Sequence, residues 1–292
     1  MLHSDVANSD GLSFILQRGY LLQELPLSIN GKTPLDVAID AAREAGTLLR
    51  ERFHTTKEVS YKGPSNLVTD VDLASERQIK ETFAREFPDF GFLGEEFGEQ
   101  GDGTGLRWIV DPVDGTRNYA LGVPHFAVSI ALVHDSDALL GVTYDPIRDE
   151  LFYTAKGEGA FLNDTCLSVA ERTSVAESLL GFDMSAMDDK AVHALNLVQR
   201  LWPGLQGVRV MGSATLGLAY AAAGRLDIYF HHNVAPWDVA AGILMVQEAG
   251  GVVHDHRGGT ASLDSTGVVT ANPPLLAEFL RLVGGMGQKT TG

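Results

Sequence analysis

The segment spanning residues 108–116 constrains the fold and chemistry of this chain more than any other. It reads Trp-Ile-Val-Asp-Pro-Val-Asp-Gly-Thr, so a short apolar run typical of a buried strand ends in two carboxylates three residues apart. Pro112 fixes its own φ and has no N–H to donate, which stiffens the turn between the acids. Gly115 permits backbone geometry that other residues resist, and the Thr116 hydroxyl can orient a water molecule. Because Mg²⁺ binds through oxygen ligands such as carboxylates, the segment indicates a metal site at a strand end.

The same segment allows a simpler interpretation, an Asp-Pro turn followed by an aspartate that caps a short helix. Its acids do not alternate as in a D-x-D-x-D-G loop, which excludes an EF-hand. The other acidic segments of the chain decide between a metal site and a capped turn.

Composition narrows the class of partner. The chain of 292 residues can bury a sizeable core in one large domain or two smaller ones. Its net charge of −16 argues against nucleic acid or an anionic membrane as partner, because phosphate groups need basic patches. The one cysteine, Cys166, excludes a disulfide framework and a multi-cysteine zinc site. No apolar run reaches the roughly 18 residues of a membrane span, and the polar N-terminus lacks a secretory signal, so we expect a cytoplasmic protein.

Periodicity predicts an N-terminal extension over residues 1–32, followed by one domain over 33–292. Thr33-Pro34 provides a cap and a proline at the first helical position, and apolar residues follow at helical spacing as far as residue 53. A second helix is predicted over 70–86, with acids in its first turn. The segment 62–66, with its Gly-Pro pair, is expected to be a mobile loop.

The pattern then changes to short strands separated by tight turns, which is typical of an antiparallel meander. The predicted strands are 127–133, 139–144, 151–154 and 159–162, preceded by an exposed loop over 98–105. Beyond Cys166, helices over 190–201, 213–223 and 237–249 alternate with strands near 208–210, 226–230 and 252–253. We therefore expect an α+β protein with an antiparallel-sheet half to about residue 165 and a mixed-sheet half after it.

Four acidic segments stand at element boundaries, where their side chains can point into a shared cleft. They are Asp70 with Asp72, Glu95 with Glu96, Asp111 with Asp114, and Asp238. Acids that are packed together repel one another and raise one another's pKa unless cations neutralise them. Because only Arg117 lies close in sequence to the central pair, we expect metal binding rather than complete ion pairing.

The order and wording of these segments resemble the inositol monophosphatase family over roughly residues 33–280. The matching motifs are Leu67-Val68-Thr69-Asp70-Val71-Asp72, Gly94-Glu95-Glu96, Asp111-Pro112-Val113-Asp114-Gly115-Thr116 and Trp237-Asp238-Val239-Ala240-Ala241-Gly242, followed by Glu248-Ala249-Gly250-Gly251. Each motif is weak alone, but together in this order they are specific. The resemblance implies a layered α-β-α-β-α sandwich of the sugar phosphatase type, Mg²⁺ as cofactor, phosphomonoesterase activity and a homodimer.

The resemblance also implies roles for individual residues. The implied metal ligands are Glu95, Asp111, the Val113 carbonyl, Asp114 and Asp238. The implied catalytic groups are Thr116 and Glu95, which orient the attacking water, and Asp72 in the family's accessory acidic position. The implied substrate contacts are Gly115, Thr116, Gly212, Ser213, Ala214 and Asp238. Two metal ions in such a site activate water and stabilise the leaving oxygen, so no covalent nucleophile is needed.

His231 departs from the family pattern. Inositol-hydrolysing members often carry a glutamate at this position, seven residues before Asp238, which contacts substrate hydroxyls. Two interpretations of the sequence remain open here: His231 and His232 are surface residues at a strand end, or one of them contacts a substrate hydroxyl or phosphate.

We therefore expect Mg²⁺-dependent hydrolysis of a sugar or polyol phosphate monoester, with inositol monophosphate as the first candidate. The alternatives are another phosphomonoester, such as fructose 1,6-bisphosphate, histidinol phosphate or a 3′-phosphoadenosine nucleotide, or a catalytically silent binding protein. The complete set of implied ligands argues against a silent protein. The expected partner is a small phosphorylated substrate, with no role for nucleic acid or membrane.

Overall fold

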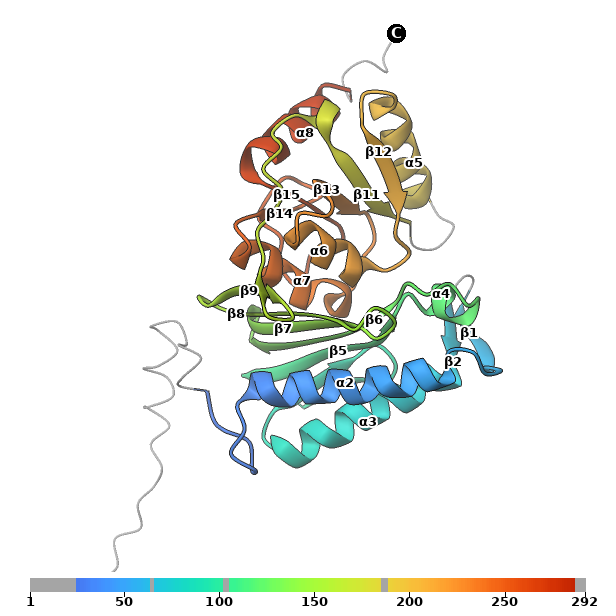
Figure 1. Cartoon of the computed structure of the whole chain (residues 1–292), viewed down its shortest axis with the longest axis vertical. Helices are drawn as coiled ribbons and strands as arrows, with labels where there is room; N and C mark the ends of the chain where they lie inside the picture. The colour runs from blue at the N-terminus through green and yellow to red at the C-terminus, as the bar shows by residue number, and fades with distance from the viewer. Residues whose placement is uncertain (1–24, 64–65, 102–104, 185–188, 287–292) are drawn as a thin grey trace, which may run out of the picture.

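The computed structural model describes residues 25–63, 66–101, 105–184 and 189–286, and these form five stacked layers (Figure 1). Two helices cover one face of a large sheet, two more lie between this sheet and a smaller one, and a last pair covers the outer face of the smaller sheet. The predicted α-β-α-β-α sandwich of the α+β class is confirmed. No described helix is both long and apolar enough to cross a membrane.

The first sheet has eight strands in the order β10-β9-β8-β7-β6-β5-β3-β4. Their bounds are β3 Gly91–Gly94, β4 Gly98–Gln100, β5 Leu106–Asp114, β6 Ala127–His134, β7 Asp137–Asp145, β8 Glu150–Ala155, β9 Gly159–Leu162 and β10 Thr165–Cys166. Strands β5 to β10 form an antiparallel meander, as the turns predicted. Strand β6 is apolar along almost its whole length because it is covered by helices on both faces.

Two sequence expectations for this half were wrong. Residues 98–100 of the predicted exposed loop form β4, which pairs antiparallel with β3 at the sheet edge. The half is also not wholly antiparallel, because β3 runs parallel to β5. The physical reason is the route of the chain. After β3, the chain turns back as β4 on the outer side of β3, and it then crosses to the other side of β3, where β5 runs in the same direction as β3.

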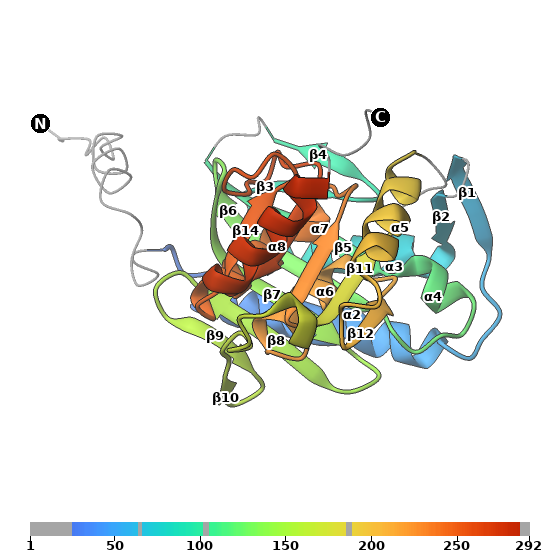
Figure 2. The same ribbon diagram turned by 90° about the horizontal axis from the view of Figure 1, so that it is seen from above.

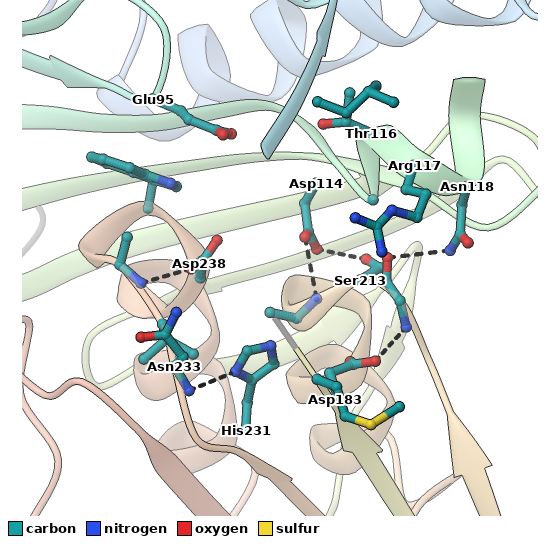
Figure 3. A pocket seen from close by; sticks show the side chains of 18 residues that line it. Glu95, Asp114, Thr116, Arg117, Asn118, Asp183, Ser213, His231, Asn233 and Asp238 are labelled. Carbon is teal, nitrogen blue, oxygen red and sulfur yellow. Dashed lines mark hydrogen bonds between the residues drawn. The ribbon is translucent and has the colours of Figure 1, made fainter. Parts of the chain in front are cut away.

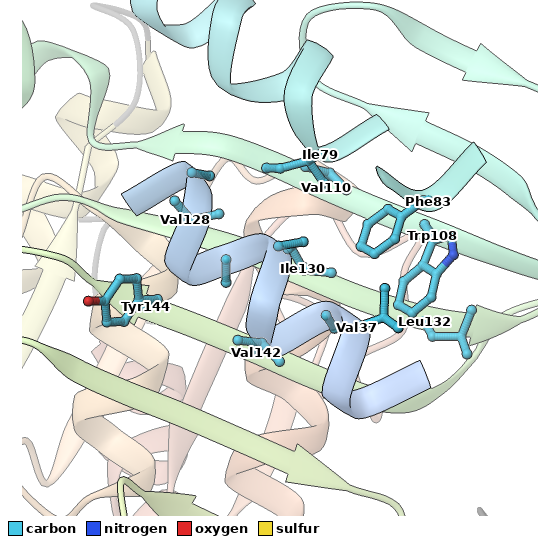
Figure 4. Close-up of a cluster of buried hydrophobic side chains, with 14 of the residues drawn as sticks. Val37, Ile79, Phe83, Trp108, Val110, Val128, Ile130, Leu132, Val142 and Tyr144 are labelled. Carbon is cyan, nitrogen blue, oxygen red and sulfur yellow. The ribbon is translucent and has the colours of Figure 1, made fainter. Parts of the chain in front are cut away.

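The first helical layer consists of α2 Pro34–Arg52 and α3 Asp70–Glu86. Both begin within one residue of the predicted position. Thr33, the predicted cap, and Thr69, which was not predicted as one, are N-caps whose hydroxyls accept from backbone N–H groups of the first turn. Figure 4 shows the core beneath this layer, where the Phe83 and Trp108 rings stack at 4.0 Å between centroids. This packing fixes the last turn of α3 against the amino end of β5. At the opposite ends of the two elements, Ser75 Oγ donates to the Pro112 carbonyl oxygen at 3.2 Å. Before α3 lies a hairpin that the sequence did not predict, β1 Val59–Gly63 with β2 Asn66–Thr69, formed by the edges of the expected 62–66 loop.

The second sheet has five strands in the order β12-β11-β13-β15-β14. Its elements are β11 Leu179–Asp183, β12 Gly207–Val210, β13 Ile228–His231, β14 Val252–Asp255 and β15 Val268–Ala271, with the short helix η2 Val175–Glu177 before them. Strand β11 is parallel to β12 and β13, whereas β15 is antiparallel to both of its neighbours, so the sheet is mixed. Strand β11 was absent from the sequence prediction.

Four longer helices cover this sheet. They are α5 Asp189–Leu201, α6 Ala214–Ala222, α7 Pro236–Glu248 and α8 Pro273–Met286. Helices α5 and α8 lie side by side on its outer face (Figure 2), and α6 and α7 separate the two sheets. Because α7 packs on both sheets, its first turn meets the carboxyl end of β5. A short helix, α4 Thr116–Ala120, begins there directly after Gly115, whose φ of 94° is in the left-handed region that favours glycine.

Candidate active site

A cavity of about 510 Å³ opens where the two halves of the sandwich meet (Figure 3). Most of the residues singled out by the sequence line it: Glu95, Asp114, Gly115, Thr116, Gly212, Ser213, Ala214, His231 and Asp238. Asp72 and Asp111 are almost completely buried and lie behind this lining. The cavity is therefore built from the ends of β3, β5, β11 and β13 and from the first turns of α4, α6 and α7.

Three carboxylates converge in this cavity. Asp111, Asp114 and Asp238 each offer an oxygen, and these atoms lie within 4.8 Å of one another. The strand pairing of β5 shifts register between Asp111 and Asp114, where Pro112 cannot donate to the ladder. The irregularity lets both aspartates serve one site, and the Val113 N–H donates to Asp111 Oδ1 at 3.0 Å, which fixes that side chain.

Burial and mutual repulsion dominate the electrostatics of Asp111, Asp238 and Glu95. Burial raises the pKa of Asp111 and of Asp238 well above the usual range of an aspartate, and nearby carboxylates add to both shifts. Burial also raises the pKa of Glu95 to about 7, although the Lys62 ammonium opposes this shift. Buried carboxylates at such distances favour a bound cation, because each is destabilised by the charge of the others.

Asp114 is held by the first turn of α6, as Figure 3 shows. Its Oδ2 accepts from Ser213 Oγ at 2.5 Å, from Thr215 N at 2.7 Å and from Thr215 Oγ1 at 2.6 Å. Within the described residues, its Oδ1 accepts one longer hydrogen bond, of 3.2 Å, from Ala214 N. With three donors on Oδ2, the carboxylate keeps a fixed orientation, and Oδ1 is the oxygen better placed to bind a cation.

Thr116 lies between two acceptors. Its Oγ1 is 3.0 Å from Asp72 Oδ1 and 3.0 Å from the Val113 carbonyl oxygen. The other oxygen of Asp72 accepts from the Thr69 hydroxyl and the Thr69 N–H, so the cap of α3 fixes this carboxylate. Burial raises the pKa of Asp72 to about 6. Because the single hydroxyl proton of Thr116 points to an acceptor of the protein, its lone pairs are left for a water molecule.

Glu95 lies on the opposite wall of the cavity and does not belong to the three-carboxylate group. Lys62 Nζ is 3.6 Å from Glu95 Oε1 and 2.6 Å from Glu96 Oε1. The buried carboxylate of Glu76 accepts from the backbone N–H groups of Glu96 and Phe97, each at 2.8 Å, and so fixes the turn that presents Glu95.

His231 is buried, with 7% of its surface exposed, and it lines the cavity. Of the two interpretations that the sequence allowed, the surface position is therefore wrong for this residue. Asn233 N donates to His231 Nδ1 at 3.0 Å, so a neutral imidazole carries its proton on Nε2.

Sequence reasoning missed several residues that shape the site. They are Lys62, Glu76, Asn118 and Asp183. All four act through contacts between residues far apart in the sequence, which no local pattern reveals. Asp183 follows an apolar strand, the same signal that identified Glu95, but the strand itself was not predicted.

The donor set fits a hard divalent cation. Mg²⁺ prefers carboxylate and carbonyl oxygens and usually keeps some of its waters. The cavity supplies carboxylate oxygens from Asp111, Asp114 and Asp238, with Glu95 on the facing wall. The raised pKa values of Asp111, Asp238 and Glu95 indicate that a cation would stabilise their ionised forms.

Mg²⁺ is expected to raise the melting temperature of the metal-free protein more at pH 8 than at pH 5. A carboxyl whose pKa is higher in the folded chain stabilises the fold below its unfolded pKa, and this stabilisation is lost as pH rises through the folded value. The folded-state pKa of Asp72 is about 6 and that of Glu95 is about 7, against unfolded values of 3.8 and 4.5. The stabilisation is therefore lost as the pH rises above these unfolded values. At pH 8 the ionised acids gain most from the metal.

Thermal unfolding with EDTA or Mg²⁺ at each pH measures this effect. At a Mg²⁺ concentration about 100-fold above its dissociation constant, the expected rise at pH 8 is on the order of 5 °C. KCl at matched ionic strength is the control, and an equal or larger rise at pH 5 would contradict the argument.

Comparison with known proteins agrees with this geometry. The sequence model of the inositol monophosphatase family matches residues 32–283. The inositol-1-monophosphatase of Mesorhizobium japonicum is 41% identical over 254 residues, 85% of this chain and 95% of that protein. The Nus factor SuhB of Escherichia coli is 39% identical over 251 residues, 84% of this chain and 94% of that protein.

Two solved structures are similar over the same region. The SuhB protein of Bartonella henselae superposes with a TM-score of 0.81 at 37% identity, covering 87% of this chain and 98% of its own. The Thermotoga maritima IMPase superposes with a TM-score of 0.80 at 33% identity, covering 87% of this chain and 98% of its own. The family match, these relatives and the converging carboxylates agree, and the chain therefore belongs to the inositol monophosphatase family of metal-dependent phosphomonoesterases.

Proposed function

We propose that this protein hydrolyses a sugar or polyol phosphate monoester in the presence of Mg²⁺, with inositol monophosphate as the first candidate substrate. The observation that carries the proposal is the convergence of Asp111, Asp114 and Asp238 in a cavity that also contains Thr116 hydrogen-bonded to Asp72. The proposed metal ligands are Glu95, Asp111, the Val113 carbonyl, Asp114 and Asp238. Mg²⁺ bound there would supply charge neutralisation and a more acidic water.

The chain's own groups would orient the water and the phosphate. The Thr116 hydroxyl donates toward Asp72 or the Val113 carbonyl and can therefore accept a hydrogen bond from a water placed beside it. Glu95, with its raised pKa, would accept the second hydrogen bond of this water. Gly115 and Thr116 open α4 and would present backbone N–H groups to the phosphate.

The alcohol group of the substrate would contact the part of the cavity wall that the C-terminal half of the chain forms. In Ser213 the hydroxyl proton is already donated to Asp114, so toward a substrate this oxygen can only accept. His231, protonated on Nε2, can donate to a hydroxyl oxygen or to a phosphate oxygen. Gly212, Ser213, Ala214 and Asp238 would complete this wall. A histidine donor differs from a carboxylate acceptor, so His231 would contact the alcohol or the phosphate differently from the glutamate of other members.

Phosphate release from a panel of phosphomonoesters tests the function. The panel contains inositol 1-phosphate, fructose 1,6-bisphosphate, histidinol phosphate and 3′-phosphoadenosine 5′-phosphate, each with Mg²⁺ or EDTA. Mg²⁺-dependent turnover of one ester is the expected outcome. If the folded protein hydrolyses none of them, the proposed substrate class is wrong, and the alternative of a catalytically silent binding protein would gain weight.

We also propose that the protein is a cytoplasmic homodimer. Its free and exposed Cys166 is consistent with a reducing compartment. Large apolar side chains are exposed at the ends of α4 and β12, with Leu121 75% and Val210 58% exposed, and a second copy of the chain would cover them. Light scattering after size exclusion should therefore give twice the chain mass, and Leu121→Glu with Val210→Glu should give the single mass. A monomeric wild-type protein would refute the proposal.

A further inference from the structure

Asp183 is a buried carboxylate that belongs to none of the motifs. It is 3% exposed, it ends β11, and it lines the cavity. Its partner across the parallel pairing of β11 and β13 is His231, so both side chains belong to the same strand-end edge. A buried carboxylate is costly unless hydrogen bonds compensate for the lost water.

Both oxygens of Asp183 accept hydrogen bonds from groups that shape the site. Tyr229 Oη donates to Oδ2 at 2.7 Å, and the Gly212 N–H donates to Oδ1. Gly212 has a φ of 71°, in the left-handed region, and a Cβ there would lie 2.8 Å from Asn118 Nδ2. The turn therefore requires glycine, and it requires an acceptor for this N–H.

The turn over residues 211–213 is held from two sides. Asp183 accepts its N–H, while Asn118 Nδ2 lies 3.2 Å from the carbonyl oxygens of both Met211 and Gly212 (Figure 3). The next residue, Ser213, caps α6 and donates to Asp114 Oδ2. A continuous path of contacts thus runs from Tyr229 and Asp183 through this turn to Asp114.

We propose that Asp183 is a positioning residue that fixes the 211–213 turn, and through it the carboxylate of Asp114 and the alcohol-facing wall of the cavity. The proposal rests on the proposed function, since it treats Asp114 as a metal ligand. Removing the acceptor leaves the N–H of Gly212 and the hydroxyl of Tyr229 buried without a partner, so the turn must move to satisfy them. Ser213 moves with it, and Asp114 loses its fixed orientation.

The test compares Asp183→Ala with a matched control, Asp227→Ala. Asp227 is 4% exposed and lies just before β13, at the far end of the same two strands. It accepts from Leu179 N at 2.8 Å and from Arg172 Nη1 at 3.0 Å, so its loss removes a similar buried acceptor away from the cavity. Thermal unfolding, Mg²⁺ titration calorimetry on metal-free protein, and kcat and KM are measured for each variant.

Asp183→Ala should weaken Mg²⁺ binding about tenfold and raise KM, the usual scale for groups that orient a metal ligand. Asp227→Ala should lower the melting temperature to a similar extent with Mg²⁺ affinity and KM unchanged. Asp183→Asn keeps one acceptor oxygen and should fall between Asp183→Ala and the wild type. If Asp183→Ala does not fold, Asp183→Asn and Tyr229→Phe carry the test, each with a smaller loss of Mg²⁺ affinity in a folded protein.

The proposal is overturned if the folded Asp183 variants bind Mg²⁺ and substrate within about twofold of the wild type, a change of only about 0.4 kcal/mol. It is also overturned if Asp227→Ala weakens Mg²⁺ binding as much as Asp183→Ala. A wild-type protein that binds Mg²⁺ but hydrolyses no ester would refute the proposed function alone, because calorimetry still reports on Asp183. A wild-type protein that binds no Mg²⁺ would refute both.

Discussion

Asp114→Asn is expected to lower kcat by at least about a thousandfold, equivalent to about 4 kcal/mol of transition-state stabilisation, while leaving the fold intact. The amide oxygen can replace Oδ2 and accept from Ser213 and Thr215, so the three short contacts with α6 survive and only the longer bond from Ala214 N is lost. The amide nitrogen then faces the other two carboxylates, where it carries no charge and cannot bind a cation. The substitution therefore removes the anionic ligand and little else.

Kinetics at saturating Mg²⁺, with circular dichroism and thermal unfolding, measure the effect. Ser213→Ala is the matched comparison, because it removes one donor to Asp114 and keeps the carboxylate. Its activity should fall far less, and its stability should fall by about 1 kcal/mol through the lost N-cap of α6. Substantial Mg²⁺-dependent turnover by a folded Asp114→Asn protein would refute the role given to Asp114.

The sequence predicted the elements that carry their own local signal. Helix α2 was predicted from a threonine cap and apolar residues at helical spacing, and α3 from the acids in its first turn. The observed bounds differ from the predicted ones by about a residue. The meander from β6 to β9 was equally readable, because tight turns separate its strands. Caps, helical spacing and tight turns depend on residues close together in the sequence, so they can be recognised before the fold is known.

Elements whose identity depends on distant partners were not predictable. Strand β4 has the composition of a loop and is a strand because β3 offers it an edge. Strand β11 is flanked by segments without clear pattern, and it is fixed by pairing on both sides, with β12 and β13. The parallel pairing of β3 with β5 likewise depends on the route of the chain and on no single residue type.

The candidate site divides in the same way. The acids at Asp111, Asp114 and Asp238 were recognisable because each stands at the boundary of a patterned element, and the structure brings them together. The groups that hold the site in place were not recognisable in that role, since Glu76 reaches the Glu96 backbone across 20 residues and Ser213 reaches Asp114 across 99. A motif can reveal the groups that act, whereas the groups that hold them in place depend on the completed fold.

Helix α7 illustrates how packing between layers sets the position of a site residue. It carries Asp238 in its first turn and lies against strand β7 at Gly141. A Cβ on Gly141 would lie 2.7 Å from the Cα of Ala241 and 3.0 Å from its carbonyl oxygen. These are backbone atoms of the helix, so no side chain can rotate away, and the helix itself must move.

Gly141→Ala is therefore expected to lower the free energy of unfolding by about 3 kcal/mol, at the upper end of the usual cost of overpacking. Because Ala241 is less than one turn from Asp238, the same displacement should weaken Mg²⁺ binding in the protein that remains folded. Gly91→Ala is the control: it is also a strand glycine of the first sheet, but its Cβ would meet the flexible side chain of Arg107 at 3.3 Å. Denaturant unfolding should show a change of less than about 0.5 kcal/mol for Gly91→Ala. Equal stabilities for the two variants would mean that the two layers can separate at Gly141 without cost, and that close contact with β7 does not fix α7 and Asp238.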